Sequence, residues 1–161
     1  MLTFTSTNKN LRLMLHKILT PGLCFLLACL LISCDNFPRD TRDSFNMARN
    51  SGLLVGVTEN PPFVILAGDS VTGTEVEIIK DFAREKSLQV KFTEGSETEL
   101  VKKLEQVQLH VLIGGFEKKT AWKKKVAMTK TYDGKHVFFI PKGENDLMWE
   151  LEGYIYKNFS K

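Results

Sequence analysis

The sequence predicts an α/β fold, with about five strands in a mostly parallel sheet and helices on both faces. The first observation is the short apolar run LLVGV at residues 53–57, which is rich in branched side chains and is followed by Pro61-Pro62. A run of this length bounded by turn residues is typical of a parallel strand buried on both faces. The second observation is that strand-like and helix-like patterns alternate through residues 51–161, which is enough chain for one small core.

Helices are predicted after the first strand. One runs from Gly73-Thr74 to about Lys86, because its apolar residues recur at helical spacing. Glu75 and Glu77 suit the positive end of this helix. Ser96 is a typical cap for a second helix. The other predicted elements are strands over residues 89–93 and 110–113, the latter ended by Gly114-Gly115, one or two helical turns over 119–125, strands over 126–132 and 136–140, and a last helix from Asn145 or Asp146 to about Phe159.

The N-terminal segment has the pattern of a secretory signal. Basic residues precede the first acid, and residues 18–32 are apolar except for Thr20 and Pro21-Gly22. The segment ends in LISC, which resembles the bacterial lipobox, so we expect cleavage before Cys34 and lipidation of that cysteine. Cys29 is a poorer second candidate, and an uncleaved anchor helix is the alternative. The predicted organisation is a lipoprotein signal peptide over 1–33, a polar tether over 34–50 and one lobe over 51–161.

Composition excludes several classes of function. All three cysteines lie in or at the end of the signal, so the mature chain has no disulfide and no cysteine-based metal site. Three of the 22 basic residues also lie in the signal, which leaves 19 against 19 acidic residues. A near-neutral mature chain gives no indication of nucleic-acid binding. We expect no metal and no cofactor.

Three segments in order are similar to the family-3 extracellular solute-binding proteins, the two-lobed periplasmic proteins of amino-acid-type ABC transporters. The segments are LLVGVTENPPF, GTEVEIIKDFA and LHVLIGGFEKKTAWKKKVAMTKTY. The resemblance implies a periplasmic-binding-protein-like (type II) lobe. In the family a second lobe is inserted after the last of these segments. Here Tyr132 is followed almost at once by HVFFIPKGENDLMW, which looks like the return strand and final helix of the first lobe, so only that lobe is expected.

Ligands of open α/β sheets bind beyond the carboxyl ends of the strands. With the resemblance, this rule gives the candidate ligand-binding residues Glu59, Phe63, Thr74, Gly114, Gly115, Glu117, Thr120 and Trp122. The backbone amides of Gly114 and Gly115 and the N-terminus of the Thr74 helix are the expected donors. In the family an arginine in the short helix binds the ligand's α-carboxylate, but Trp122 stands there and no arginine follows Arg84. A cationic or aromatic solute is therefore expected. The alternative is that Trp122 packs under the short helix, Glu117 is solvated and no small ligand binds.

Three classes of function are compatible with these residues. The first is a non-catalytic, lipid-anchored periplasmic protein that binds a small solute for an ABC permease, with a second copy or a partner replacing the missing lobe. The second is an interaction or sensor module that docks a membrane protein and has no small ligand. The third, an enzyme, has little support: His110 and His136 begin apolar strands, and the mature chain has no Gly-x-Ser-x-Gly or His-Glu-x-x-His motif.

Overall fold

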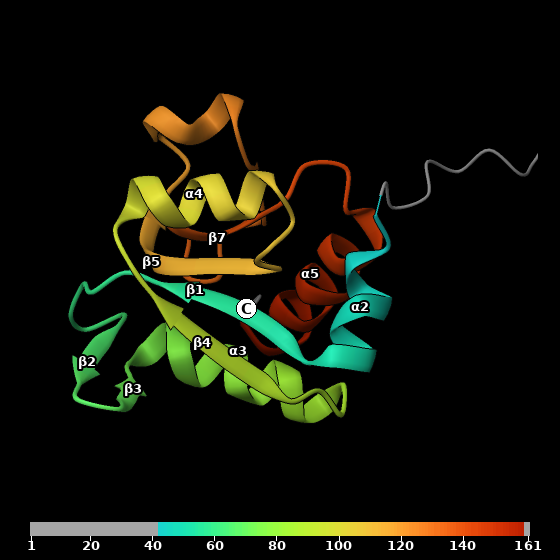
Figure 1. The fold of residues 1–161 in the computed structure, drawn as a ribbon, viewed down its shortest axis with the longest axis horizontal. Coiled ribbons are helices and arrows are strands. Elements are labelled where there is room, and N and C mark those ends of the chain that lie inside the picture. The colour runs from blue at the N-terminus through green and yellow to red at the C-terminus, as the bar shows by residue number, and fades with distance from the viewer. Residues whose placement is uncertain (1–41, 160–161) are drawn as a thin grey trace, which may run out of the picture. The chain divides into compact units, whose positions relative to one another are not determined.

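The computed structural model describes residues 42–159, and these form a sheet with helices packed on both faces (Figure 1). The signal peptide, Cys34 and the first part of the predicted tether lie outside the described residues. The helical elements are α2 (Ser44–Ser51), α3 (Thr74–Glu85), α4 (Glu97–Glu105), the 3-10 turn η1 (Ala121–Lys124) and α5 (Asn145–Phe159). The strands are β1 (Leu53–Val57), β2 (Ile65–Ala67), β3 (Ser70–Thr72), β4 (Val90–Glu94), β5 (Val111–Glu117), β6 (Ala127–Met128) and β7 (His136–Ile140).

The main sheet has five strands in the order β4-β1-β5-β7-β6. β1 pairs in parallel with β4 on one side and with β5 on the other, so that Val55 lies opposite both Phe92 and Val111. β7 is antiparallel to β5 and to β6. The predicted α/β class, with its mostly parallel sheet of about five strands, is therefore confirmed. The carboxyl end of β1 lies next to Ile113 of β5, and β5 continues beyond it to Glu117.

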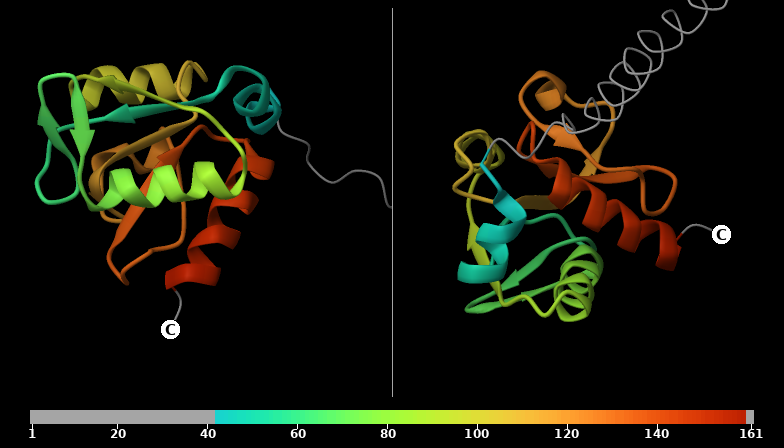
Figure 2. Two further views of the ribbon diagram at one scale, coloured as in Figure 1. Left: turned by 90° about the horizontal axis from the view of Figure 1, so that it is seen from below. Right: turned by 90° about the vertical axis from the view of Figure 1, so that its right-hand side faces the viewer.

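Each face of the sheet packs against its own set of helices. Because side chains alternate along a strand, Val55 and Ile113 face α3 and α5, whereas Leu112 and Phe139 face α4. Figure 2 shows α3 and α5 together on one face, where Phe82 and Tyr154 meet with ring centroids 5.7 Å apart. Both cores are built from fully buried aliphatic and aromatic residues, as the apolar patterns predicted.

Helix α2 corrects the predicted tether. From Ser44 onward this segment is not a linker but a helix packed against α5 and β1, with Phe45 only 6% exposed and Ala48 fully buried. The carboxylate of Glu144 accepts hydrogen bonds from the backbone amides of Arg42 and Ser44, at 3.1 and 2.9 Å. The polar composition of the segment concealed these contacts, because they come from a residue about a hundred positions away.

Replacing Glu144 with alanine is expected to weaken the attachment of α2. The carboxylate is 2% exposed and caps two amides at the start of the helix, and loss of such a cap costs about 1–2 kcal/mol. Hydrogen exchange should therefore speed up at the amides of α2 and hardly change in β1. The matched control is Glu59→Ala, which removes an exposed carboxylate. Equal exchange rates in α2 of the wild type and Glu144→Ala would contradict the prediction.

Other boundaries also differ from expectation. The short antiparallel hairpin β2–β3 was not predicted. Gly114-Gly115 does not end its strand, because β5 continues to Glu117 through a shift of register between Leu112 and Phe116. The strand predicted over 126–132 shrinks to β6, and its hydrogen bonding to β7 continues through Thr129. Among residues 42–159, no helix combines the length and apolar character needed to cross a bilayer.

Candidate functional site

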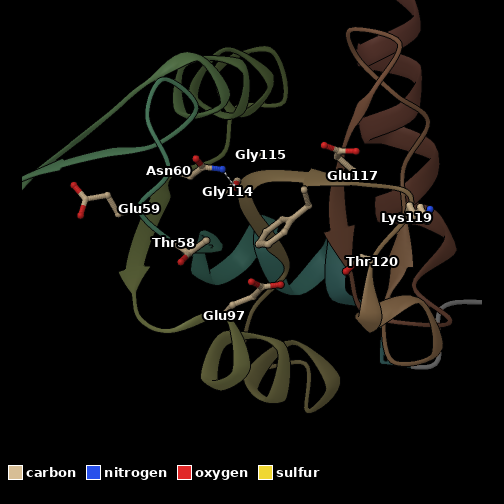
Figure 3. Close-up of a pocket in the computed structure, with 10 residues that line it drawn as sticks. Thr58, Glu59, Asn60, Glu97, Gly114, Gly115, Glu117, Lys119 and Thr120 are labelled. Carbon is tan, nitrogen blue, oxygen red and sulfur yellow. Dashed lines mark hydrogen bonds between the residues drawn. The ribbon is translucent and has the colours of Figure 1, made fainter.

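A cleft of about 440 Å³ opens where β1 and β5 end (Figure 3). It lies there because parallel neighbouring strands bring the loops that follow them to the same edge of the sheet. Its walls come from the loop after β1, the start of α4, the end of β5 and the loop before η1. The lining residues are Thr58, Glu59, Asn60, Glu97, Gly114, Gly115, Phe116, Glu117, Lys119 and Thr120.

The cleft contains only part of the predicted site. Glu59, Gly114, Gly115, Glu117 and Thr120 line it. The predicted Phe63, Thr74 and Trp122 are not among the lining residues. Glu97 was missed by sequence reasoning, although its position was available: it follows Ser96 just beyond β4, whose carboxyl end neighbours that of β1. Thr58, Asn60, Phe116 and Lys119 were not among the named candidates, and they flank residues that were.

The loop after β1 is fixed to β5 by Asn60. Its side-chain amide donates to the carbonyl oxygen of Gly114 at 2.8 Å, and its backbone carbonyl accepts from the amide of Phe63 at 2.9 Å. The Phe63 ring lies against Gly115, where a Cβ atom would come within 2.4 Å of the ring. Gly115 has φ 70°, a left-handed conformation that favours glycine. Phe63 also contacts His136, with ring centroids 4.4 Å apart, so its role here is to pack the loop rather than to line the cleft.

Glu75 occupies the two backbone donors that were expected to serve a ligand. One of its oxygens, Oε2, accepts from the amides of Gly114 and Gly115 at 2.8 and 2.9 Å, and Oε1 accepts from the hydroxyl of Tyr132 at 2.6 Å. Glu75 is fully buried, and this desolvation raises the pKa of its carboxyl although all three hydrogen bonds oppose the shift. The prediction that these glycine amides are free to bind a ligand is therefore wrong.

The N-terminus of α3 is occupied in the same way. The amide of Thr74 donates to the carbonyl oxygen of Pro62 at 3.0 Å, and the amide of Glu75 donates to that of Phe63 at 3.1 Å. The hydroxyl of Thr74 is directed to the Pro62 carbonyl too, at 3.5 Å. The amides of Thr74 and Glu75 therefore hold the preceding loop, and these two amides are not available to an anion.

Trp122 and Glu117 have protein partners. The indole Nε1 of Trp122 donates to the carboxylate of Glu97, and its ring packs partly buried against the α4 side of the sheet. Trp122 thus packs as the alternative interpretation expected. Glu117 is exposed and pairs with Lys135 at 2.9 Å, which lowers the pKa of the Glu117 carboxyl. Figure 3 shows the Glu97 side chain directed from α4 toward the cleft, whereas the Glu59 carboxylate points away from it.

The two histidines of the folded part are held by protein groups. His110 is 1% exposed, its Nδ1 accepts from the amide of Leu54 at 3.1 Å, and burial lowers its pKa. The Nδ1 of His136 lies 2.6 Å from a carboxylate oxygen of Asp133, in the turn before β7. Within the described part of the chain, no three histidine, cysteine or acidic side chains gather as a metal site would need.

Solved structures show the same fold. A mutant of the arginine-bound domain 1 of the arginine-binding protein from T. maritima aligns with TM-score 0.65 and 23% identity, over 70% of this chain and 95% of that one. A mutant of the same binding protein aligns with TM-score 0.51 and 26% identity, over 55% of this chain and 40% of that one. An ancestral amino-acid-binding protein, a precursor of cyclohexadienyl dehydratase, aligns with TM-score 0.63 and 12% identity, over 74% and 100%.

The match to the isolated domain agrees with the predicted single lobe. No curated protein sequence matches the chain. The model of the bacterial extracellular solute-binding proteins, family 3, matches residues 53–158, which run from the start of β1 almost to the end of α5. The chain therefore belongs to the family-3 bacterial extracellular solute-binding proteins.

Proposed function

We propose that this protein is a lipid-anchored, non-catalytic solute-binding component of an ABC transport system in the periplasm. A small cationic or aromatic solute binds in the cleft at the ends of β1 and β5. The observation that supports this most is the position of the cleft: in a family-3 fold, it lies where two neighbouring parallel strands end. The lipid is attached at Cys34, and the anchored chain delivers its solute to a permease.

Comparison with solved structures supports a single lobe as a binding unit. The domain 1 structures from T. maritima are described as arginine-bound forms, so one lobe of this fold holds a ligand in that protein. A one-sided cleft still leaves part of its ligand in water, which limits affinity. A second copy of the chain, placed over the cleft, would supply the missing wall.

The walls of the cleft favour a positively charged solute. Glu97 extends toward the cleft from the start of α4, and Glu117 lies at the end of β5. Phe116 is the aromatic residue of the lining; it is mostly buried, and its ring stacks on that of Phe139 with centroids 4.3 Å apart. Glu97 is held by the Trp122 indole, so the carboxylate is pre-positioned.

A solute should stabilise the protein against heat. A ligand at a hundred times its Kd adds about 2.7 kcal/mol to the free energy of unfolding, which raises the melting temperature of a domain this size by about ten degrees or more. The full chain, purified in detergent, is screened by thermal shift against amines, aromatic acids and amino acids at millimolar concentration. Trp149→Ala, on the exposed face of α5, is the control and should respond like the wild type. No shift with any compound contradicts the proposal.

An interaction module without a small ligand is the second candidate function. Trp149 and Tyr156 on α5 are 80% and 71% exposed, and large exposed aromatic residues are common where proteins dock. A negative solute screen together with membrane-protein crosslinks lost in Trp149→Ala would favour this function.

A further inference from the structure

We infer that the cleft selects an organic cation that carries no carboxylate, such as a polyamine or an alkyl guanidine. This inference rests on the proposed solute-binding function and narrows its substrate class. It follows from the positions that hydrogen-bond donors and acceptors take around the cleft. The glycine and helix amides that were expected to bind a carboxylate are already bonded within the protein, while carboxylate acceptors remain at the walls.

The first two donors, the amides of Gly114 and Gly115, are occupied by the buried side chain of Glu75. The amides of Gly114 and Gly115 both donate to the same oxygen of Glu75, at 2.8 and 2.9 Å. The Glu75 carboxyl group has the oxygen geometry of a ligand carboxylate, and it binds these amides from the interior. It is fully buried and further held by Tyr132. A solute carboxylate would have to displace it, and the buried Glu75 would then lose its partners.

The second set of donors, at the N-terminus of α3, is occupied by backbone carbonyl groups. Helix N-termini bind anions through their free amides. In α3 the amides of Thr74 and Glu75 are bonded to the carbonyl oxygens of Pro62 and Phe63, at 3.0 and 3.1 Å. These two amides of the first turn therefore bind the loop that precedes the helix and are not free for a solute carboxylate.

Guanidinium groups are engaged elsewhere on the described part of the chain. Arg42 donates to the carbonyl oxygen of Gln106, Arg49 lies over the Phe45 ring, and Arg84 pairs with Asp81 at 2.7 Å. None of them lines the cleft. Lys119 is the one cation among the lining residues, and an ammonium is a hydrated point charge without the two parallel donors of a guanidinium.

The cleft offers more acceptors to a cation than donors to an anion. Oε1 of Glu97 is bonded by the indole of Trp122, which orients the carboxylate and leaves Oε2 for another donor. Glu117 adds a second carboxylate from another element; its Oε1 pairs with Lys135 at 2.9 Å. An amine or guanidinium group has only donors, so it suits these oxygens. A carboxylate on the same solute would lie close to charges of its own sign.

Pairs of compounds that differ by one carboxylate test the inference. Arginine is compared with agmatine, and lysine with cadaverine, by calorimetric titration of the full chain in detergent. We expect each decarboxylated compound to bind at least about tenfold more tightly than its amino acid. Lys119→Ala should bind agmatine more tightly than the wild type, because a like charge is removed from the wall.

Variants identify the carboxylate. Glu97→Gln should weaken agmatine binding by about tenfold, because a neutral amide replaces the charged acceptor. The matched control is Glu77→Gln, which changes an exposed carboxylate of α3 that pairs with Lys80 at 3.0 Å. Unchanged agmatine affinity in Glu97→Gln would overturn the assignment.

Two further outcomes separate this inference from the function on which it rests. If arginine binds more tightly than agmatine, and Lys119→Ala removes that preference, the inference fails and solute binding stands. If none of the four compounds and no compound of the thermal-shift screen binds, solute binding itself fails and the inference fails with it.

Discussion

Replacing Glu75 with leucine is expected to lower the free energy of unfolding by at least about 3 kcal/mol. Leucine is similar in size, so the change removes hydrogen-bond acceptors more than volume. The amides of Gly114 and Gly115 and the hydroxyl of Tyr132 would all lose their partner, and the Glu75 site is inaccessible to solvent. Each buried donor left unpaired costs about 1–3 kcal/mol. Urea unfolding followed by tryptophan fluorescence measures the loss.

Two companion variants separate the hydrogen bonds from other effects. Glu75→Gln keeps an acceptor for the glycine amides and should lose much less stability than Glu75→Leu. Tyr132→Phe removes a single donor to the carboxylate and should cost about 1 kcal/mol. If Glu75→Leu and Glu75→Gln were equally stable, the contacts of the carboxylate with the glycine amides would not be stabilising the fold.

The same carboxylate should make stability depend on pH. Burial raises the pKa of Glu75 above its ordinary value of 4.5, so between these two values the folded state binds more protons than the unfolded state. The contribution is full below the ordinary pKa and is lost as the pH rises through the folded pKa. The stability of the wild type relative to Glu75→Gln should therefore fall over the pH range above the ordinary pKa of 4.5. A difference that grows over this range would contradict the assigned sign.

The architecture could be predicted because its signals are local. The apolar run before Pro61-Pro62 marked β1, and helical spacing marked α3 and α5. The edge of the sheet that carries the cleft followed from the rule that ligands of open α/β sheets bind beyond the carboxyl ends of the strands. The strand and helix signals depend on neighbours within one element, where burial repeats at a fixed period.

The chemistry of the site was less predictable because its signals are distant. Glu75 was expected to be one of two acids that favour the start of a helix, but its partners at Gly114 and Tyr132 lie 39 and 57 residues away. No periodic pattern distinguishes a helix acid that turns inward from one that faces water, and Glu77 is in fact exposed. Glu97 was missed for a related reason. It reaches the cleft because β4, which precedes it, pairs with β1, and the two strands are distant in the sequence.

Gly73→Ala is expected to destabilise the fold by about 2–5 kcal/mol. Gly73 has φ 126°, a backbone conformation that residues with a side chain rarely adopt. An added Cβ would lie 2.3 Å from the carbonyl oxygen of Phe63, which is backbone and cannot rotate away. That carbonyl and its neighbour at Pro62 accept from the first amides of α3, so any shift that relieves the clash breaks these bonds. Denaturant unfolding measures the loss.

Gly153→Ala is the matched control, since it makes the same chemical change inside α5, where an added Cβ meets nothing within 4 Å. Alanine is favoured over glycine in a helix by about 0.5–1 kcal/mol, so this variant should be more stable than the wild type. The two substitutions should therefore have opposite signs. Because Phe63 also packs on Gly115, Gly73→Ala should disturb the wall of the cleft and weaken solute binding even where the protein remains folded. If Gly73→Ala had wild-type stability, the Phe63 carbonyl could not lie against Gly73. The described contact between the loop after β1 and the start of α3 would then be wrong.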